Sequence, residues 1–191
     1  MTGPASDKSR AGVAGAGGVR GLGASMSQSM HRMFARVAPA LRPIGSERAA
    51  DCARLHERSF AFFWGEADFE QLLTTAEVVA DGADAAVEPD GRLCGMLLSR
   101  VAADEAEILT IAVAPERRRA GLGAALLRAH LPRLRARFCA KLFLEVEASN
   151  AAAKALYAAA GFHQIAERKA YYRKEGAAPA TALLMRLDFA P

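Results

Sequence analysis

Apolar and polar positions follow a regular order only after the first forty residues of the chain. Residues 1–28 consist mostly of Gly, Ala and Ser and show neither helical nor strand periodicity. Such a segment buries too little apolar surface to offset the entropy lost on ordering it. We therefore expect a disordered, Gly/Ala/Ser-rich basic tail over residues 1–39 and one folded domain over residues 40–191.

The first half of that domain reads as a short strand, two helices and a run of antiparallel strands. Ser46 is the expected N-cap of the first helix, which runs toward Phe60. The sequence Glu-Pro-Asp-Gly at 88–91 is a reversal signal between two strands. The expected strands lie at 40–44, 78–79, 85–87, 93–101 and 106–113, and the expected second helix lies at 66–73.

The second half alternates strands with helices. Pro132 lies inside the helical spacing of residues 121–137 and is expected to kink or end that helix. Gly161 follows the alanine-rich helix expected over 150–160, and a glycine just after a helix closes it well. With strands at 142–146, 162–167 and 183–189, the whole pattern predicts a mixed α/β (α+β) domain with one central sheet.

Composition and charge narrow the class of protein. No apolar run reaches the roughly 18 residues that a membrane span needs, and the N-terminus lacks a signal-peptide pattern. We therefore expect a soluble cytoplasmic protein with no membrane partner. The net charge of +4 is carried by the tail, because residues 1–43 sum to +5 and the remaining residues to −1. Direct nucleic-acid binding by the folded domain is not expected.

Cysteine and histidine are too scattered for a metal centre or a disulfide framework. No CxxC pair exists, and no two histidines have ligand spacing on one helix face. The three cysteines have mostly apolar neighbours, so we expect them to be small core residues that bind no metal: Cys52, Cys94 and Cys139.

The strongest chemical signal is the segment ILTIAVAPERRRAGLGAALL at residues 108–127, which reads as strand, tight turn, glycine-rich loop and helix. Gly121 and Gly123 remove Cβ atoms where the backbone must approach another group closely. Amides at a helix N-terminus lack intrahelical partners, and with the helix dipole they form an anion site suited to a pyrophosphate. Three arginines at 117–119 add positive charge.

A Walker loop, a dinucleotide-binding loop and a purely structural turn are the other interpretations of this glycine-rich segment. It is not a Walker loop, because no Gly-Lys-Ser/Thr follows. It is a poor dinucleotide fingerprint, because Leu126 stands where the third glycine belongs, although Glu145 lies at about the right distance for a ribose-binding acid. The dinucleotide interpretation and a purely structural turn both stay open on the loop alone.

Two motifs in the right order resemble the GNAT superfamily of acetyltransferases. The first is Arg118-x-x-Gly121-x-Gly123 after a strand ending Val-Ala-Pro, and the second is LFLEVEASNAAAKALYAAAGF at 142–162. The resemblance covers roughly residues 43–189. Within the superfamily the chain is most similar to the RimI type, the ribosomal-protein alanine N-acetyltransferases, through FLEVEASNAAAKALY, SFAFFWGEADFEQLL and the pair Tyr171-Tyr172.

The resemblance implies a GNAT-like domain whose mostly antiparallel central sheet splays between its middle strands and is flanked by helices. It also implies acetyl-CoA as co-substrate. Its pantetheine arm would pair with the backbone of Ile111, Ala112 and Val113, and Asn150 would contact it near the reacting end. The residues implied to cradle the pyrophosphate are Arg118, Arg119, Ala120, Gly121, Leu122, Gly123 and Ala124.

Acetyl transfer to an amine needs a base, an acid and an oxyanion donor. Glu145 is the candidate base because it interrupts an apolar strand, where an unused charge is costly. Glu147, two residues on and on the same side, competes for that role, and a salt-bridged strand residue is the alternative. Tyr157 is the candidate acid for the departing thiolate, or else a packed aromatic. The amide of Val113 is the candidate oxyanion donor.

The acceptor amine is expected to be the N-terminal α-amine of a protein or peptide, possibly a ribosomal protein. An α-amine with a pKa near 7.7–8.0 is roughly one-tenth neutral at pH 7, against about one in a few thousand for a lysine. Trp64, Tyr171 and Tyr172 are candidate acceptor-binding residues, whereas the phenylalanines at 60–63 are expected to be core. Ala180 and Thr181 stand where the RimI type has an acidic pair, so a small-molecule amine acceptor or a non-catalytic acyl-CoA-binding module remain alternatives.

Overall fold

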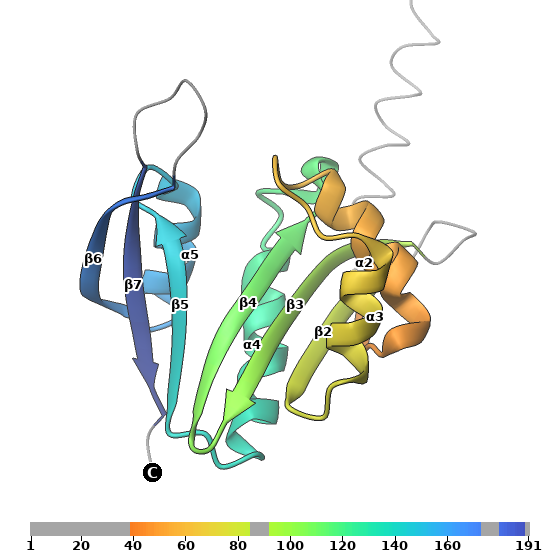
Figure 1. Ribbon diagram of the computed structural model, residues 1–191, viewed down its shortest axis with the longest axis horizontal. Coiled ribbons are helices and arrows are strands. Elements are labelled where there is room, and N and C mark those ends of the chain that lie inside the picture. The colour runs from red at the N-terminus through yellow and green to blue at the C-terminus, as the bar shows by residue number, and fades with distance from the viewer. Residues whose placement is uncertain (1–38, 85–91, 173–179, 190–191) are drawn as a thin grey trace, which may run out of the picture. The chain divides into compact units, whose positions relative to one another are not determined.

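The central feature of the fold is one seven-stranded sheet, seen in a computed structural model that describes residues 39–84, 92–172 and 180–189 (Figure 1). The expected tail, the 85–87 strand and the 88–91 reversal lie outside these residues, apart from residue 39. Every neighbouring pair of strands is antiparallel except β4 and β5. The sheet order is β1-β2-β3-β4-β5-β7-β6, with β1 at Ala40–Pro43, β2 at Val78–Asp84, β3 at Leu93–Ala102, β4 at Glu105–Val113, β5 at Lys141–Glu147, β6 at His163–Tyr172 and β7 at Ala180–Asp188.

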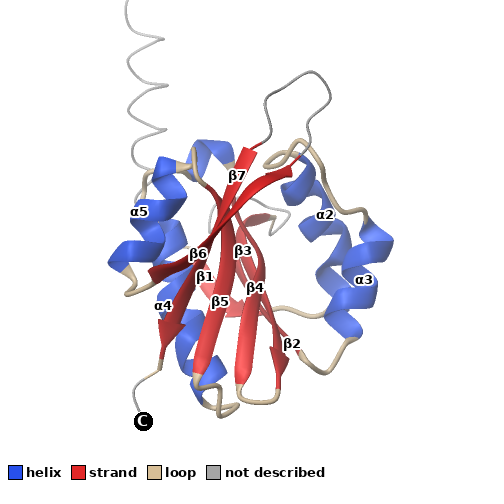
Figure 2. Ribbon diagram, turned by 60° about the vertical axis from the view of Figure 1, so that its left-hand side comes forward, coloured by secondary structure: helices blue, strands red, loops and turns tan. Residues whose placement is uncertain are grey.

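Four helices cover the two faces of this sheet. Helices α2 and α3 lie on one face and α4 and α5 on the other (Figure 2). Leucines on both α4 and the strands are fully buried, so the main core lies between α4 and the sheet. This arrangement confirms the mixed, mostly antiparallel α/β prediction. The helices are α2 at Ala49–Glu57, α3 at Glu66–Thr74, α4 at Leu122–Arg135 and α5 at Ala151–Ala159, with 3₁₀ turns η1 at Ser46–Arg48 and η2 at Pro115–Arg117.

Two sequence predictions concern helix ends. The prediction that Ser46 caps the first helix is wrong, because Ser46 begins η1, and the amide of Gly45 before it donates to the Glu47 carboxylate at 3.0 Å. Of the two effects expected of Pro132, a kink or an end, the structure contradicts the second, because α4 continues to Arg135. Tertiary contacts hold the last turn despite the missing amide: Leu134 is fully buried, and Arg133 pairs with Asp81 at 2.6 Å.

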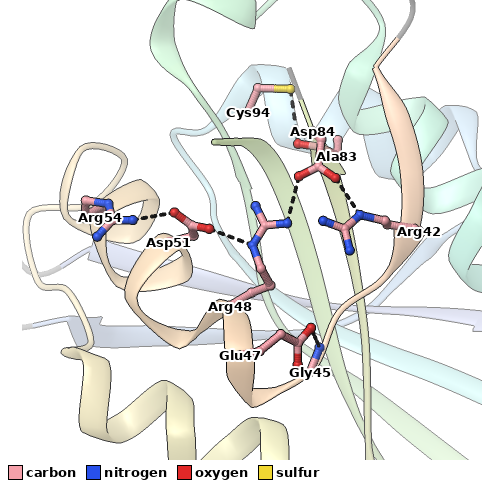
Figure 3. A network of polar contacts seen from close by, with 9 residues as sticks. All are labelled: Arg42, Gly45, Glu47, Arg48, Asp51, Arg54, Ala83, Asp84 and Cys94. Carbon is pink, nitrogen blue, oxygen red and sulfur yellow. Dashed lines mark hydrogen bonds and ion pairs between the residues drawn. The ribbon is translucent and has the colours of Figure 1, made fainter. Parts of the chain in front are cut away.

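A chain of alternating charges fastens β1 and α2 to β2 (Figure 3). The buried guanidinium of Arg48 donates to Asp51 at 2.6 Å and to Asp84 at 2.9 Å, and Asp84 also accepts from Arg42 at 2.5 Å. Burial alone lowers the pKa of Arg48, but its hydrogen bonds to the two carboxylates outweigh that effect and raise it. Arg54 completes the chain by donating to Asp51. The network positions the first helix of the domain against the sheet.

The feature that prepares a binding site is the divergence of β4 and β5. These parallel strands are in register only at 105–107 of β4 and 141–143 of β5. Residues 108–113 and 144–147 of the same strands then separate, as Figure 1 shows by the gap between the green and cyan arrows. The expected splaying of the middle strands is confirmed, and it leaves one edge of β4 without a neighbouring strand.

Candidate active site

The free edge of β4 presents backbone amides toward β5. The amide of Ala114 donates to the carbonyl of Cys94 on β3 at 2.9 Å, so it points away from β5. Successive amides of a strand point in opposite directions, and the register irregularity of β4 lies earlier, near Leu109. The amides of Val113 and Ile111 therefore face the space between β4 and β5. An extended amide-containing group could pair there as a further strand would.

The glycine loop after β4 is built from two left-handed residues. Arg119 has φ of 62° and Gly121, the N-cap of α4, has φ of 80°. Left-handed turns point successive amides into a concavity that attracts anions. A left-handed non-glycine residue costs on the order of 1 kcal/mol and tends to occur at ligand-binding sites. A Cβ at Gly121 would meet no atom within 4 Å, so this glycine is required by conformation rather than by crowding.

Close packing places this loop beside α5 and the end of β4. A Cβ on Gly123 would come within 3.1 Å of Leu156 on α5. The side chain of Arg118 reaches back, and its Nε donates to the carbonyl of Val113 at 3.1 Å. Arg117, by contrast, lines a separate cavity of about 410 Å³ with Arg54 on α2 and Arg58 just after it. Arg118 and Arg119, but not Arg117, therefore accompany the amides of the loop.

Helix α5 carries Asn150 and Tyr157 at its two ends. Asn150 is the N-cap, and its Oδ1 accepts the amide of Ala153 at 3.0 Å, which leaves its Nδ2 to donate elsewhere. Tyr157 is buried, with its ring 5.6 Å from that of Phe162. Burial raises the pKa of Tyr157 to about 12, so its hydroxyl keeps a proton to donate throughout the physiological range.

Glu145 lies on β5 between the buried residues Leu144 and Val146 and faces the opposite side of the sheet from them. One carboxylate oxygen lies 2.8 Å from Nη1 of Arg168 on β6. The sequence analysis did not identify Arg168, because no local pattern links it to a residue 23 positions earlier. Glu147 instead accepts a hydrogen bond from Ser149 at 2.7 Å.

A cavity of about 480 Å³ opens in front of Glu145. Gly95 and Ser99 of β3 pack against α4, so the alternate residue Arg100 faces away from α4, toward the α2 and α3 side. Since Arg100 and Glu145 line the same cavity, the cavity lies on that side of the sheet. Its lining residues are Arg100, Ala102, Glu105, Ala106, Glu107, Phe143, Glu145, Arg168 and Leu184.

The loop between α2 and α3 is aromatic and largely exposed. Phe60, Phe62 and Phe63 are 40%, 79% and 52% exposed, so the expectation that they are core residues is wrong. The loop has no helical or strand periodicity to direct them inward. Trp64 stacks on His56, and Phe60, although 40% exposed, also contacts the His56 ring. Tyr171 and Tyr172 belong to β6, where Tyr172 pairs with Ala180. The structure does not describe their side chains.

A Ser–His–Asp arrangement elsewhere in the domain is structural. His130 Nδ1 lies 2.6 Å from Asp81 and its Nε2 lies 2.8 Å from the Ser99 hydroxyl. All three side chains are within the core beneath α4, and Ser99 and His130 have no exposed surface. A nucleophile must meet its substrate, so this array tethers α4 to β2 and β3. The three cysteines are also buried, as expected, and burial raises the pKa of each thiol.

Comparison with known proteins assigns the family. Residues 49–162 match the model of the Acetyltransferase (GNAT) family. The ribosomal protein bS18-alanine N-acetyltransferase of Escherichia coli K12 is 37% identical over 123 residues, which are 62% of this chain and 76% of that protein. A mycothiol acetyltransferase of Clavibacter michiganensis is 43% identical over 86 residues, 45% of this chain and 28% of that protein.

Solved structures agree with the family assignment. The crystal structure of the ribosomal-protein-S18-alanine N-acetyltransferase from Escherichia coli covers 78% of this chain and 92% of its own, with 31% identity and a TM-score of 0.69. Arabidopsis thaliana NAA60 in complex with acetyl-CoA covers 78% and 97%, with 20% identity and a TM-score of 0.68. The chain therefore belongs to the GNAT family of acetyltransferases, a fold that binds acetyl-CoA. It is an N-acetyltransferase similar to the enzymes that modify ribosomal protein bS18.

The described residues contain neither a membrane-spanning helix nor a group of metal ligands. None of the helices in the described ranges is long and apolar enough to cross a membrane. Within the same ranges, no three His, Cys, Asp or Glu side chains gather as metal ligands would.

Proposed function

We propose that this enzyme transfers the acetyl group of acetyl-CoA to the N-terminal α-amine of a protein, and that the acceptor is a ribosomal protein modified in the cytoplasm. The observation that carries the proposal is the unpaired edge of β4 beside the left-handed loop. One surface thus offers strand-like amides at Ile111 and Val113 for an amide-containing arm and a concave anion site at 118–124 for a pyrophosphate.

The acceptor is proposed to reach the reacting centre from the α2 and α3 side. Glu145 faces that side, and so does the cavity of about 480 Å³ that it lines. Tyr157 belongs to α5 on the other side of the sheet (Figure 2). A base and an acid on opposite sides of the split sheet suit a direct transfer, in which acceptor and donor meet between β4 and β5.

The proposed steps balance without a covalent enzyme intermediate. Glu145 takes a proton from the α-ammonium, directly or through water, and the free amine attacks the thioester carbonyl. The Val113 amide donates a hydrogen bond to the oxygen that becomes negative. The C–S bond then breaks, Tyr157 donates its proton to the leaving thiolate, and the attacking nitrogen releases its extra proton to solvent. Proton exchange with solvent returns a proton to Tyr157 and removes the one on Glu145, so the enzyme is restored with one proton released per turnover. The buried thiol of Cys139 has no role in this scheme.

The similarity to the bS18-modifying enzymes supports a protein substrate, since the match covers most of the length of the Escherichia coli enzyme. The mycothiol acetyltransferase match favours a second candidate, a small-molecule amine, but it covers only 28% of that protein. The exposed phenylalanines near Trp64 favour an extended acceptor, because large exposed apolar side chains mark interaction surfaces.

Thiol release during turnover tests this proposal. The purified full chain is mixed with acetyl-CoA and, in separate reactions, with a peptide bearing a free N-terminal alanine, with an N-acetylated peptide that contains lysine, and with a small-molecule amine, either an aminoglycoside or a polyamine. We expect release only with the first peptide. Release only with the small-molecule amine would establish the small-molecule alternative. If the chain binds acetyl-CoA but no amine, ribosomal proteins included, leads to release of the thiol, the chain is a non-catalytic acyl-CoA-binding module.

A further inference from the structure

The carboxylate proposed as base is held by a cation from another strand. Glu145 Oε1 and Arg168 Nη1 are 2.8 Å apart, and the Glu145 side chain is 18% exposed while that of Arg168 is 53% exposed. The carboxylate is thus the buried member of the pair and the guanidinium the exposed one. Arg168 lies on β6, the edge strand of the sheet, where a long side chain has room to turn outward.

The charges around this pair make the cation necessary. The same cavity is lined by two further carboxylates, Glu105 and Glu107. Lys141 pairs with Glu105 at 2.9 Å, and Arg100 contributes another positive charge from β3. A carboxylate that is partly shielded from water loses stabilisation when its partner is removed. Among the cationic side chains that line the cavity, Arg168 forms the ion pair with Glu145.

We propose that Arg168 is a positioning residue that holds the Glu145 carboxylate in place in the free enzyme and then yields it to the acceptor's α-ammonium. This inference rests on the proposed function, because it takes Glu145 as the base. Exchange of one cation for another keeps the carboxylate paired at every stage. When Glu145 then accepts the proton, an N–H bond of the ammonium breaks, an O–H bond forms on the carboxylate, and the amine becomes a neutral nucleophile.

A conservative variant separates this role from a structural one. In Arg168→Gln the carboxylate loses the cation that holds it, so kcat for the acceptor peptide should fall by about tenfold to a hundredfold, because a misplaced catalytic group slows the reaction itself. Arg168→Lys retains the charge and should recover most of the wild-type kcat. Lys169→Gln is the matched control, because it removes an exposed positive charge from the next residue of the strand.

A measurement without turnover supports the kinetics. Calorimetry should give the same Kd for acetyl-CoA in Arg168→Gln as in the wild type, because Arg168 is not among the residues proposed to hold the cofactor. Arg168→Met provides a second variant should Arg168→Gln fold poorly, and thermal melts of all variants identify any such failure.

The outcomes distinguish the two proposals. If Glu145→Gln is impaired but Arg168→Gln and Arg168→Met keep the wild-type kcat, Glu145 is the base and the role of Arg168 is wrong. An equal loss of kcat in Arg168→Lys and Arg168→Gln would also overturn it, because the charge would then be irrelevant. If Glu145→Gln is fully active, the proposed function has lost its base, whatever the Arg168 variants do.

Discussion

The indole ring of Trp64 stacks on the imidazole of His56, with ring centroids 4.9 Å apart and planes 10° apart. The backbone amide of Trp64 donates to Nδ1 of His56 at 3.1 Å, so that nitrogen carries no proton. Burial lowers the pKa of His56 to about 4. The packing of Trp64 therefore depends on a neutral histidine.

This histidine predicts that stability falls in mild acid. The folded pKa near 4 lies below the ordinary 6.5, so the unfolded chain binds the extra proton first. Stability is fully present above about pH 6.5 and falls as the pH decreases toward 4, by roughly 3 kcal/mol in total. Urea unfolding at a series of pH values measures this change.

The matched variant for that experiment is His56→Gln, which should lose the His56 part of the slope between pH 6.5 and 4. His130, whose pKa burial also lowers, contributes in the same direction and remains in the variant. Asp84 acts in a lower range, because hydrogen bonds from Arg42 and Arg48 outweigh burial and lower its pKa. A His56→Gln profile identical to the wild type would show that His56 does not titrate as described.

The left-handed conformation of Gly121 predicts a loss of acetyl-CoA affinity on substitution. Gly121→Asp strains the backbone at φ of 80° and adds a negative charge beside the expected pyrophosphate. Calorimetry should give a Kd at least tenfold higher, about 1.4 kcal/mol or more. Gly121→Asn is the control, since asparagine tolerates this conformation and has the same size without charge. If Gly121→Asp and Gly121→Asn bind acetyl-CoA with equal affinity, the added charge has no effect and the loop is not an anion site.

Loss of the Tyr157 hydroxyl should slow turnover without weakening acetyl-CoA binding. Tyr157→Phe removes the proton donor but keeps the ring that packs on Phe162. A positioned acid contributes about 10²–10⁴-fold, so kcat should fall by that factor. Steady-state kinetics and calorimetry on the same preparation check both halves of the expectation. Unchanged kcat would make Tyr157 a packing residue only.

Glu145→Gln should lower the rate most at neutral pH and recover in part at higher pH, where more of the acceptor α-amine is already neutral. The relevant range is roughly pH 6 to 9, which spans the pKa of an α-amine. Glu147→Gln is the matched comparison two residues along the same strand, where the carboxylate accepts a hydrogen bond from Ser149. Full activity of Glu145→Gln together with a defect in Glu147→Gln would transfer the base role to Glu147.

Deletion of residues 1–28 should leave the melting temperature and the turnover of a short peptide unchanged. The segment lies outside the described residues, and its composition offers little apolar surface to bury. Differential scanning calorimetry and peptide kinetics on the shortened chain test this. A substantial loss of either would show that the tail takes part in folding or catalysis.

The parts of the fold that sequence predicted well are those governed by local rules. Helix α5 begins at Asn150 and is followed by Gly161 at φ of 96°, as capping preferences indicate. The turn before α4 was located because glycine spacing is a local signal. Pro132 shows the limit of such rules, since burial of Leu134 and the Arg133–Asp81 pair hold the helix past it.

The parts that escaped prediction depend on residues distant in the sequence. Arg168 and Glu145 meet only because β7 pairs with both of their strands, and β7 comes last in the chain. His130 likewise meets Ser99 and Asp81 from three separate elements. The exposure of Phe62 was missed for another reason: an aromatic cluster has the same composition whether it packs inward or faces a partner.

The narrow junction between β4 and β5 has a consequence for how the chain can be divided. Strands β1 to β4 come from one continuous stretch, 40–113, and β5 to β7 from another, 141–188. Helix α4 packs on the first stretch, and α5 belongs to the second. A cut in the loop at 136–140 would leave two fragments, each with its own hydrogen-bonded sheet, joined at three register pairs. This enzyme is therefore a natural candidate for fragment complementation, with acetylation itself as the report that the two pieces have found each other.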